Sequence, residues 1–439
     1  MKKIDSLLIF NLFIFITISI YLLFNFNILF NNSKYFFIYL TVFTSLSSAF
    51  FIYSIFFFNR NIKLIILICF YSLITALYLF EFYLSFVNEK IIFENSKKNK
   101  YEIVLDLRSQ NEEAFLNINP SLFINSKEFN REYSIYPLGS ISNIFTVQNN
   151  ELGFNPIFKT DKFGFNNENI IYENKIENIL IGDSFVEGCC VKNKDNISEI
   201  LNKLEMNTLN LGKSGNGPLI EFATFLEYAP SIKPDRILWF YYPNDFKNLK
   251  NEIKSNTLKK YLIDENYSQN LIKRQDEIDN TLVNYITSKE KSYINKINEE
   301  KLDLLKNNWL IKNLKFTNTR IKLNLININN NFSDNNYLNE IDIFLNILLR
   351  TKKITESWNG ELVFIYLPSI IQINNNKVND FHKDFLKKIK NKNIKIINIK
   401  KELIDNIENP YSLLSNDTGG HFNVKGYKLI ANKIYESLR

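Results

Sequence analysis

The residues with the clearest chemical potential lie in the stretch Gly-Asp-Ser-Phe-Val-Glu-Gly at 182–188. The chain has only 12 glycines in 439 residues, yet two of them bracket Ser184, directly after the apolar run 176–181. The carboxyl end of a buried strand is a place where sheet enzymes expose a nucleophile. The Gly-x-Ser-x-Gly elbow of α/β-hydrolases is absent. We therefore predict that Ser184 is a nucleophile; the alternative is a turn that merely contains a serine.

A serine becomes nucleophilic near neutral pH only beside a base, and the chain has two histidines. His382 lies in the amphipathic pattern 380–390, which predicts a surface position. His421 follows two glycines just before the closing helical pattern, so we predict that His421 is the base. Asp417, four residues earlier, is the candidate for orienting the imidazole, and a backbone carbonyl is the alternative.

The elements that must position these residues alternate between strands and helices. Short apolar runs predict strands, and apolar residues at helical spacing predict helices. The predicted strands are 176–181, 207–211, 235–242, 361–368 and 393–400, and the predicted helices are 197–204, 218–229 and 424–438. This alternation predicts an α/β fold with a parallel sheet covered on both faces. Residues 246–360 interrupt it with Lys, Asn and Glu at helical spacing, as in 299–316, and predict a helical insertion.

Four stretches at the predicted strand ends resemble, in order, the motif blocks of the SGNH (GDSL-like) hydrolase family. They are GDSFVEG at 182–188, NLGKSGNGP at 210–218, YYPNDF at 241–246 and DTGGHFNVKGY at 417–427. Together with the segment 140–167, they look like a group of membrane-anchored bacterial SGNH-like proteins. The resemblance covers about residues 140–439 and is looser in the third and fourth blocks.

The resemblance implies a flavodoxin-like three-layer α/β/α domain and a set of roles. Ser184 and His421 would be catalytic with Asp417, although the family's acid position, three residues before the histidine, is Thr418 here. The oxyanion would be held by the N–H groups of Ser184 and Gly215 and by the side-chain amide of Asn244. A glycine suits that approach because it has no Cβ.

One departure from the family bears on Asn244. Tyr242 stands where the family's third block has glycine, which puts the geometry of that loop in doubt. The alternative interpretation is that Asn244 only caps a turn after the third strand.

The first 87 residues are almost continuously apolar. Three stretches, Leu7–Phe30, Tyr35–Phe58 and Ile62–Val87, are each long enough to cross a bilayer, which takes about 20 residues. Cytoplasmic loops carry an excess of Lys and Arg, which would place the N-terminus inside. The residues used for this orientation are Lys2, Lys3, Arg60 and Lys63 on one side and Lys34 on the other.

The predicted organisation is therefore a three-span membrane anchor at 1–87, a β-rich linker or cap at 88–175, and the SGNH-like domain at 176–439. The β-rich assignment rests on alternating stretches such as 101–107 and 142–147. With three spans, everything after Val87 would lie outside the cytoplasm.

Charge and cysteine content argue against a nucleic-acid-binding protein and against a zinc site. The chain has 53 Lys and Arg and 46 Asp and Glu, a net charge of +7 without a single-sign field in the soluble part, so we expect no nucleic-acid partner. Cys69, Cys189 and Cys190 form no Cys-x-x-Cys pair and no Cys/His zinc spacing. We predict that they are small buried thiols and that the protein uses no metal and no organic cofactor.

Together with the predicted spans, the resemblance implies a membrane-anchored serine esterase of the bacterial cytoplasmic (inner) membrane, with its catalytic domain on the periplasmic or extracytoplasmic side. The expected partners are the lipid bilayer and an ester substrate, and the resemblance implies acetyl groups on envelope or exported polysaccharide as that substrate. Two alternatives remain open at this stage. One is an O-acetyltransferase that uses the same serine and an acyl-donating membrane partner, and the other is a catalytically inactive SGNH-like binding module.

Overall fold

The computed structural model describes residues 2–24, 34–95, 100–127, 129, 134–303, 316, 319, 337–369, 372–373, 380–415 and 420–439. The chain divides into two compact units. The first, here the helical unit, comprises Met1–Glu89 with Lys301–Asn329. The second, here the α/β unit, comprises Lys90–Glu300 with Asn330–Arg439.

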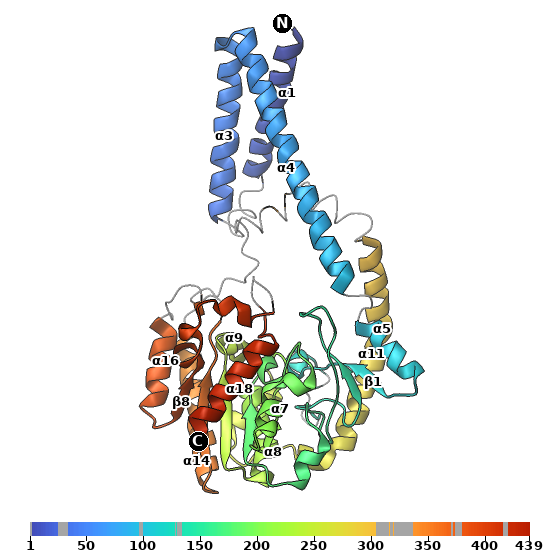
Figure 1. Ribbon diagram of the computed structural model, residues 1–439, viewed down its shortest axis with the longest axis vertical. Coiled ribbons are helices and arrows are strands. Elements are labelled where there is room, and N and C mark those ends of the chain that lie inside the picture. The colour runs from blue at the N-terminus through green and yellow to red at the C-terminus, as the bar shows by residue number, and fades with distance from the viewer. Residues whose placement is uncertain are drawn as a thin grey trace. The chain divides into compact units, whose positions relative to one another are not determined.

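The helical unit contains three long apolar helices, α1 (Lys2–Phe24), α3 (Lys34–Phe57) and α4 (Arg60–Asn95), which lie side by side in Figure 1. Leu8, Phe51 and Leu67, one from each helix, form a small buried cluster. The Lys63 ammonium also donates to the Asp5 carboxylate at 2.8 Å, which ties α4 to α1. The three helices therefore pack as a bundle.

Two of the three predicted spans meet the length and apolar composition of a membrane span within the described residues. Lys3–Leu22 and Arg60–Leu84 are long and apolar enough to cross a membrane, whereas the apolar part of α3, Thr41–Phe57, is shorter than a span within the described residues. The predicted end of the first span at Phe30 and the turn at 31–33 lie outside the described residues.

The centre of the α/β unit is a five-stranded parallel sheet. Its strands are β4 (Asn178–Ile181), β5 (Thr208–Asn210), β6 (Arg236–Tyr241), β7 (Glu361–Tyr366) and β8 (Lys395–Asn398), in the order β5-β4-β6-β7-β8. Each falls inside a predicted strand. Numbered along the chain, the order is 2-1-3-4-5, the flavodoxin-like arrangement, so the α/β fold with a parallel sheet is confirmed.

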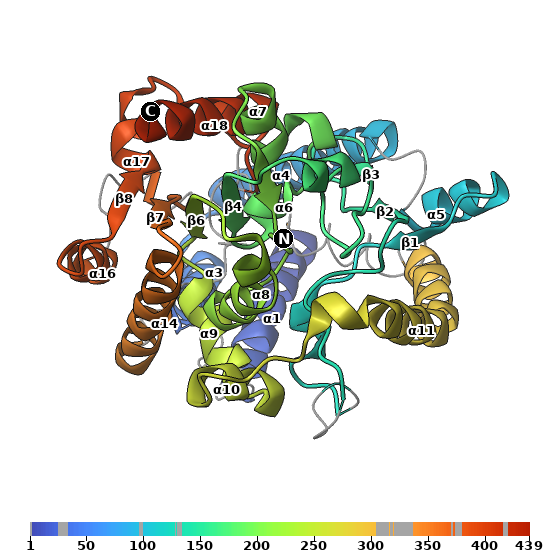
Figure 2. The same ribbon diagram turned by 90° about the horizontal axis from the view of Figure 1, so that it is seen from below.

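Helices cover both faces of this sheet. Alternate strand residues point to opposite sides, and the side chains on both sides are apolar. Leu180, Leu238 and Ile365 pack into one buried cluster with side chains of α7 (Ile197–Lys203) and α18 (Val424–Leu438). Ile179, Trp239 and Phe364 pack into the other with α8 (Pro218–Ile232) and α14 (Leu338–Glu356). Figure 2 shows the two helical layers with the strands between them.

The described part of the predicted insertion is mostly helical. It consists of α9 (Asp245–Glu252), α10 (Asn256–Ile263), α11 (Gln275–Asp303) and α14, joined in part by the 3₁₀ turn Leu271–Arg274. Most of the stretch 299–316 lies outside the described residues. After β7, α16 (Asp380–Lys390) precedes β8, and α17 (Ile399–Glu402) follows it.

The segment ahead of the sheet is mixed. β1 (Ala114–Leu116), β2 (Phe145–Val147) and β3 (Ile157–Lys159) form a separate small sheet, as the alternation at 142–147 predicted. The prediction of strand at 101–107 is wrong, because α5 (Lys100–Ser109) is a helix. Tyr101 and Val104, three residues apart, form its buried face, and three-residue spacing fits one face of a helix.

Candidate active site

Ser184 is the first residue of the short helix α6 (Ser184–Glu187), which begins directly after β4. The Asp183 side chain caps this helix by accepting a hydrogen bond from Phe185 N at 3.0 Å. A Cβ on Gly182 would lie 2.5 Å from Val186 Cγ2, so the turn is too tight for any other residue. Gly188 ends the helix with φ +83°, a conformation that favours glycine. The two glycines around Ser184 are therefore required by the turn that presents it.

His421 reaches this serine from the loop before α18. Its Nε2 lies 2.7 Å from Ser184 Oγ, and its ring lies 4.8 Å from that of Phe185. The loop is held by the backbone bond from Ser415 N to His421 O at 2.8 Å and by Asn423, which caps α18 by accepting from Gly426 N. The structure thus joins the two residues that the sequence predicted as nucleophile and base.

The other imidazole nitrogen meets Glu151, which was not among the predicted site residues. His421 Nδ1 lies 2.9 Å from Glu151 Oε1, and the second oxygen, Oε2, accepts from His421 N at 3.0 Å and from Ser415 Oγ at 2.9 Å. Asp417, the predicted acid, lies outside the described residues. The sequence signal for Glu151 was its place within the segment 140–167 that carries part of the family resemblance.

The environment of Glu151 favours its ionised form. Partial burial by itself raises the pKa of this carboxyl, but the hydrogen bonds and charge of His421, with the bond from Ser415, outweigh it and lower the pKa to about 2. A carboxylate facing Nδ1 selects the tautomer with the proton on Nδ1. Nε2 is then left with a lone pair directed at the Ser184 hydroxyl.

The backbone N–H groups of Ser184 and Gly215 are the two that the sequence analysis expected to hold an oxyanion. Within the described part of the chain, neither Ser184 N nor Gly215 N donates a hydrogen bond. Gly215 has φ +74°, a backbone conformation that favours glycine, and a Cβ there would lie 2.7 Å from Ser121 Oγ. Asn244 stands at the start of α9 but makes no side-chain capping bond, which removes the capping role considered as the alternative.

The Tyr242 departure has a local explanation. Tyr242 N donates to Asp245 Oδ2 at 3.2 Å, and Asp245 N donates back to Tyr242 O at 3.0 Å, so the turn is closed by its own residues. The Tyr242 ring packs 4.5 Å from that of Phe185, the residue after Ser184. A large side chain at this position therefore forms part of the wall around Ser184.

A fully buried ion pair joins the turn of Ser184 to the loop of Gly215. The carboxylate of Glu187, at the end of α6, accepts from Lys213 Nζ at 2.6 Å and from Ser214 N at 3.0 Å, and also from the Ser214 hydroxyl. Asn117 Nδ2 donates to the same carboxylate at 3.0 Å. Lys213 and Glu187 have no exposed side-chain surface. This network fixes the distance between two parts of the site.

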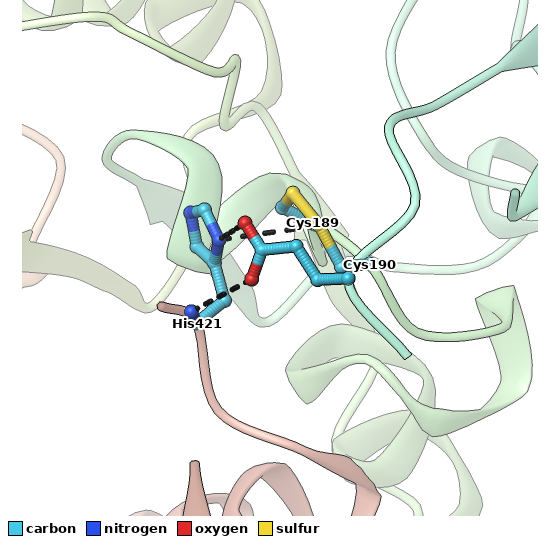
Figure 3. Close-up of side chains that lie close together, drawn as sticks. Cys189, Cys190 and His421 are labelled. Atoms are coloured by element: carbon cyan, nitrogen blue, oxygen red, sulfur yellow. Dashed lines mark hydrogen bonds and ion pairs between the residues drawn. A yellow bond between two sulfur atoms is a disulfide. The ribbon is translucent and has the colours of Figure 1, made fainter. Parts of the chain in front are cut away.

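The adjacent cysteines differ from the prediction of free buried thiols, since Cys189 and Cys190 form a disulfide. Cys190 adopts φ +75°, and its sulfur lies 3.9 Å from His421 Nδ1. Figure 3 shows both cysteine side chains beside His421. The sequence patterns used to recognise cysteine pairs and zinc sites have residues between the cysteines, so two adjacent cysteines fall outside them.

The sequence predicted a surface position for His382, and this prediction is only partly correct. Its Nδ1 lies 2.6 Å from the Tyr241 hydroxyl, its ring packs against Phe246, and the side chain is half-buried. These contacts lie on the face of the sheet covered by α8 and α14, whereas Phe185 packs on the opposite face.

No family model matches the chain, and no curated protein is similar to it. Among solved structures, the chain is similar to two proteins described as lipolytic members of the G-D-S-L family. The one from Desulfitobacterium hafniense shows 14% identity and a TM-score of 0.33, over 60% of this chain and 98% of that one. The one from Veillonella parvula shows 14% identity and a TM-score of 0.32, over 59% and 96%.

Proposed function

We propose that this protein is a serine esterase of SGNH type, with Ser184, His421 and Glu151 as its catalytic residues. The observation that carries the proposal is the continuous chain of hydrogen bonds from Ser184 Oγ through both imidazole nitrogens to the Glu151 carboxylate. A nucleophile, a base and a group that orients the base are the parts that acyl transfer by serine requires, whatever their order in the sequence.

In the proposed reaction, Ser184 Oγ attacks the ester carbonyl carbon while its proton passes to His421 Nε2. The tetrahedral intermediate then collapses, and the leaving alcohol takes that proton. Water, deprotonated by the same Nε2, attacks the acyl-serine and releases the carboxylic acid. Glu151 stays ionised and stabilises the imidazolium formed in both halves.

The charge that develops on the carbonyl oxygen needs donors that are not already engaged. The N–H groups of Ser184 and Gly215, which donate to no described acceptor, and the Asn244 amide fit this role. Donors fixed in place before reaction stabilise the transition state without reorganisation.

We further propose that the helical unit anchors the protein in the bacterial cytoplasmic membrane by three passes. Large apolar side chains are exposed along it, among them Phe13 at 66% and Leu73 at 61%, and a bilayer would cover such surface. Lys2, Arg60 and Lys63 would face the cytoplasm, which places the α/β unit on the outer side. The proposed substrate is an acylated envelope or exported polysaccharide.

The test of the esterase is a fluorophosphonate probe applied to the full chain in detergent, followed by hydrolysis of a short-chain model ester. We expect labelling of the wild type and of Ser109→Ala, whose hydroxyl is exposed on α5, and none of Ser184→Ala. A folded wild-type chain that neither reacts with the probe nor hydrolyses esters would support a binding module instead.

A separate test concerns the membrane. A C-terminal alkaline phosphatase fusion should be active in a bacterial host, and a C-terminal green fluorescent fusion should be dark. The reverse pattern would contradict an outer location of the α/β unit.

A further inference from the structure

Four metal-ligating side chains converge beside the proposed nucleophile. Glu151, Cys189, Cys190 and His421 each offer one ligand atom, and these atoms all lie within 4.8 Å of one another. Among the residues that the structure describes, no other group of three or more such side chains gathers in this way. The proposed esterase chemistry uses Glu151 and His421 and leaves the two sulfur atoms without a role.

The chemistry of this donor set suits zinc when the sulfur atoms are reduced. Zinc in proteins takes four ligands in tetrahedral geometry from cysteine, histidine and carboxylate, at about 2.0–2.3 Å from the metal. Glu151 Oε1 already lies 2.9 Å from His421 Nδ1, and Cys190 Sγ lies 3.9 Å from the same nitrogen. Ligands around one zinc ion stand apart by about these distances, so small side-chain movements would complete the site.

We propose that reduction of the Cys189–Cys190 disulfide creates a zinc site from these four residues, and that zinc bound there switches off Ser184. The zinc site stands by itself, whereas the switch rests on the proposed esterase function. While the disulfide is intact its sulfur atoms carry no thiolate charge, and thiolates are the form that binds metal. The disulfide and the zinc site are therefore alternative states of the same two cysteines.

The redox step requires an external dithiol or a phosphine. A dithiolate attacks one sulfur, forms a mixed disulfide and is released in oxidised form, leaving two cysteine thiols after uptake of two protons. Zinc then displaces both thiol protons as it binds. Cys189, at 6% exposure, is more accessible than the fully buried Cys190, and the half-buried side chains of Glu151 and His421 offer the ion a path.

Zinc would inactivate the serine because of where the imidazole proton must go. In the active arrangement Nδ1 holds the proton and Nε2 offers a lone pair to the Ser184 hydroxyl. A metal on Nδ1 needs the lone pair of that atom, so a neutral imidazole must carry its proton on Nε2. Nε2 can then no longer accept the serine proton, and the base is lost without any change in the Ser184 turn.

The binding test uses the full chain in detergent with Cys69→Ser, because Cys69 is a free, exposed thiol that could bind metal by itself. The protein is reduced with a phosphine, desalted and titrated with Zn²⁺ against a chromogenic chelator, and with Co²⁺ to detect thiolate-to-metal absorption. We expect about one zinc ion per reduced chain. The oxidised protein, which has the same sequence, should bind none, and Glu151→Gln should weaken binding by about tenfold or more.

The activity test is run on the same samples. Zinc should abolish ester hydrolysis by the reduced protein, a chelator should restore it, and the oxidised protein should keep its activity in zinc. In Cys189→Ser/Cys190→Ser, activity should be insensitive to both reductant and zinc. If the reduced protein binds zinc but the oxidised protein hydrolyses no ester, the proposed esterase function fails and the metal site stands.

Either of two results would overturn the metal site. One is equal zinc binding by the oxidised and reduced proteins, and the other is a reduced protein whose Co²⁺ spectrum lacks thiolate absorption. If zinc binds through the thiolates but reduced protein stays active at saturating zinc, the site stands and the switch fails.

Discussion

The two halves of the candidate site are built in different ways. Ser184 is presented by one continuous turn, residues 182–188, whose cap and glycines all lie within that stretch. His421 and Glu151 come from loops 270 residues apart in the chain and are held by hydrogen bonds to each other and to Ser415. Ser184 is thus positioned locally, and His421 is positioned by tertiary contacts.

This contrast has a consequence for mutation. Changes in the Ser184 turn should act on the attacking atom itself, whereas changes around His421 should act through the tautomer and orientation of one ring.

The largest effect is expected from either residue that touches the transferred proton. Ser184→Ala and His421→Ala should each lower kcat for a short-chain ester by about 10⁶-fold, because the serine and its base act as one unit. The double variant should be no worse than the worse of the two. His382→Ala is the matched control and should stay nearly as active as the wild type; an inactive His382→Ala with an active His421→Ala would reverse the assignment.

The next effect distinguishes Glu151, the carboxylate that meets His421 in the structure, from Asp417, the candidate acid chosen from the sequence. Glu151→Gln should lower kcat by about 10⁴-fold, since a neutral amide no longer enforces the Nδ1–H tautomer or stabilises the imidazolium. Asp417→Asn should leave kcat within a few-fold of wild type. Kinetics of the two matched amide variants decide the matter, and the opposite ranking would restore Asp417.

A third prediction concerns the buried pair that joins the two loops. Lys213→Met should lower the free energy of unfolding by about 3–5 kcal/mol, because it leaves the Glu187 carboxylate buried without its cation. Lys213→Met/Glu187→Leu should recover part of that loss in denaturant titrations. Lys175→Met, which breaks a pair exposed at 71% and 47%, should cost less than about 1 kcal/mol. Equal losses for the two lysine variants would mean that the buried network stabilises nothing.

The smallest effect is expected at Asn244. Asn244→Ala should lower kcat by about 10²-fold with little change in KM, the usual cost of losing one oxyanion donor. Since the side chain caps nothing, its melting temperature should match that of the wild type. A destabilised variant with wild-type turnover would remove Asn244 from the site.

The sequence by itself determined the sheet and half of the site. After its polar first residue, each of β4, β6 and β7 is a buried apolar run, and such runs can be recognised without any knowledge of their neighbours. Ser184 and His421 could be predicted because one follows a strand in a glycine-bounded turn and the other is one of only two histidines. The strand predicted at 101–107 is the helix α5 because its apolar residues fit both strand alternation and one face of a helix.

Only the tertiary structure decided which carboxylate meets the imidazole and where the two sulfur atoms lie. Glu151 is distant from His421 in sequence, and no pattern within its own loop shows that folding brings the two within 2.9 Å. Cys189 and Cys190 are likewise ordinary neighbours until α6 turns them toward His421. The pattern of apolar residues in a segment shows which of its faces is buried. Contacts between loops depend instead on how all the elements between them pack. The contacts of Glu151 and of the two cysteines with His421 are therefore visible only in the folded chain.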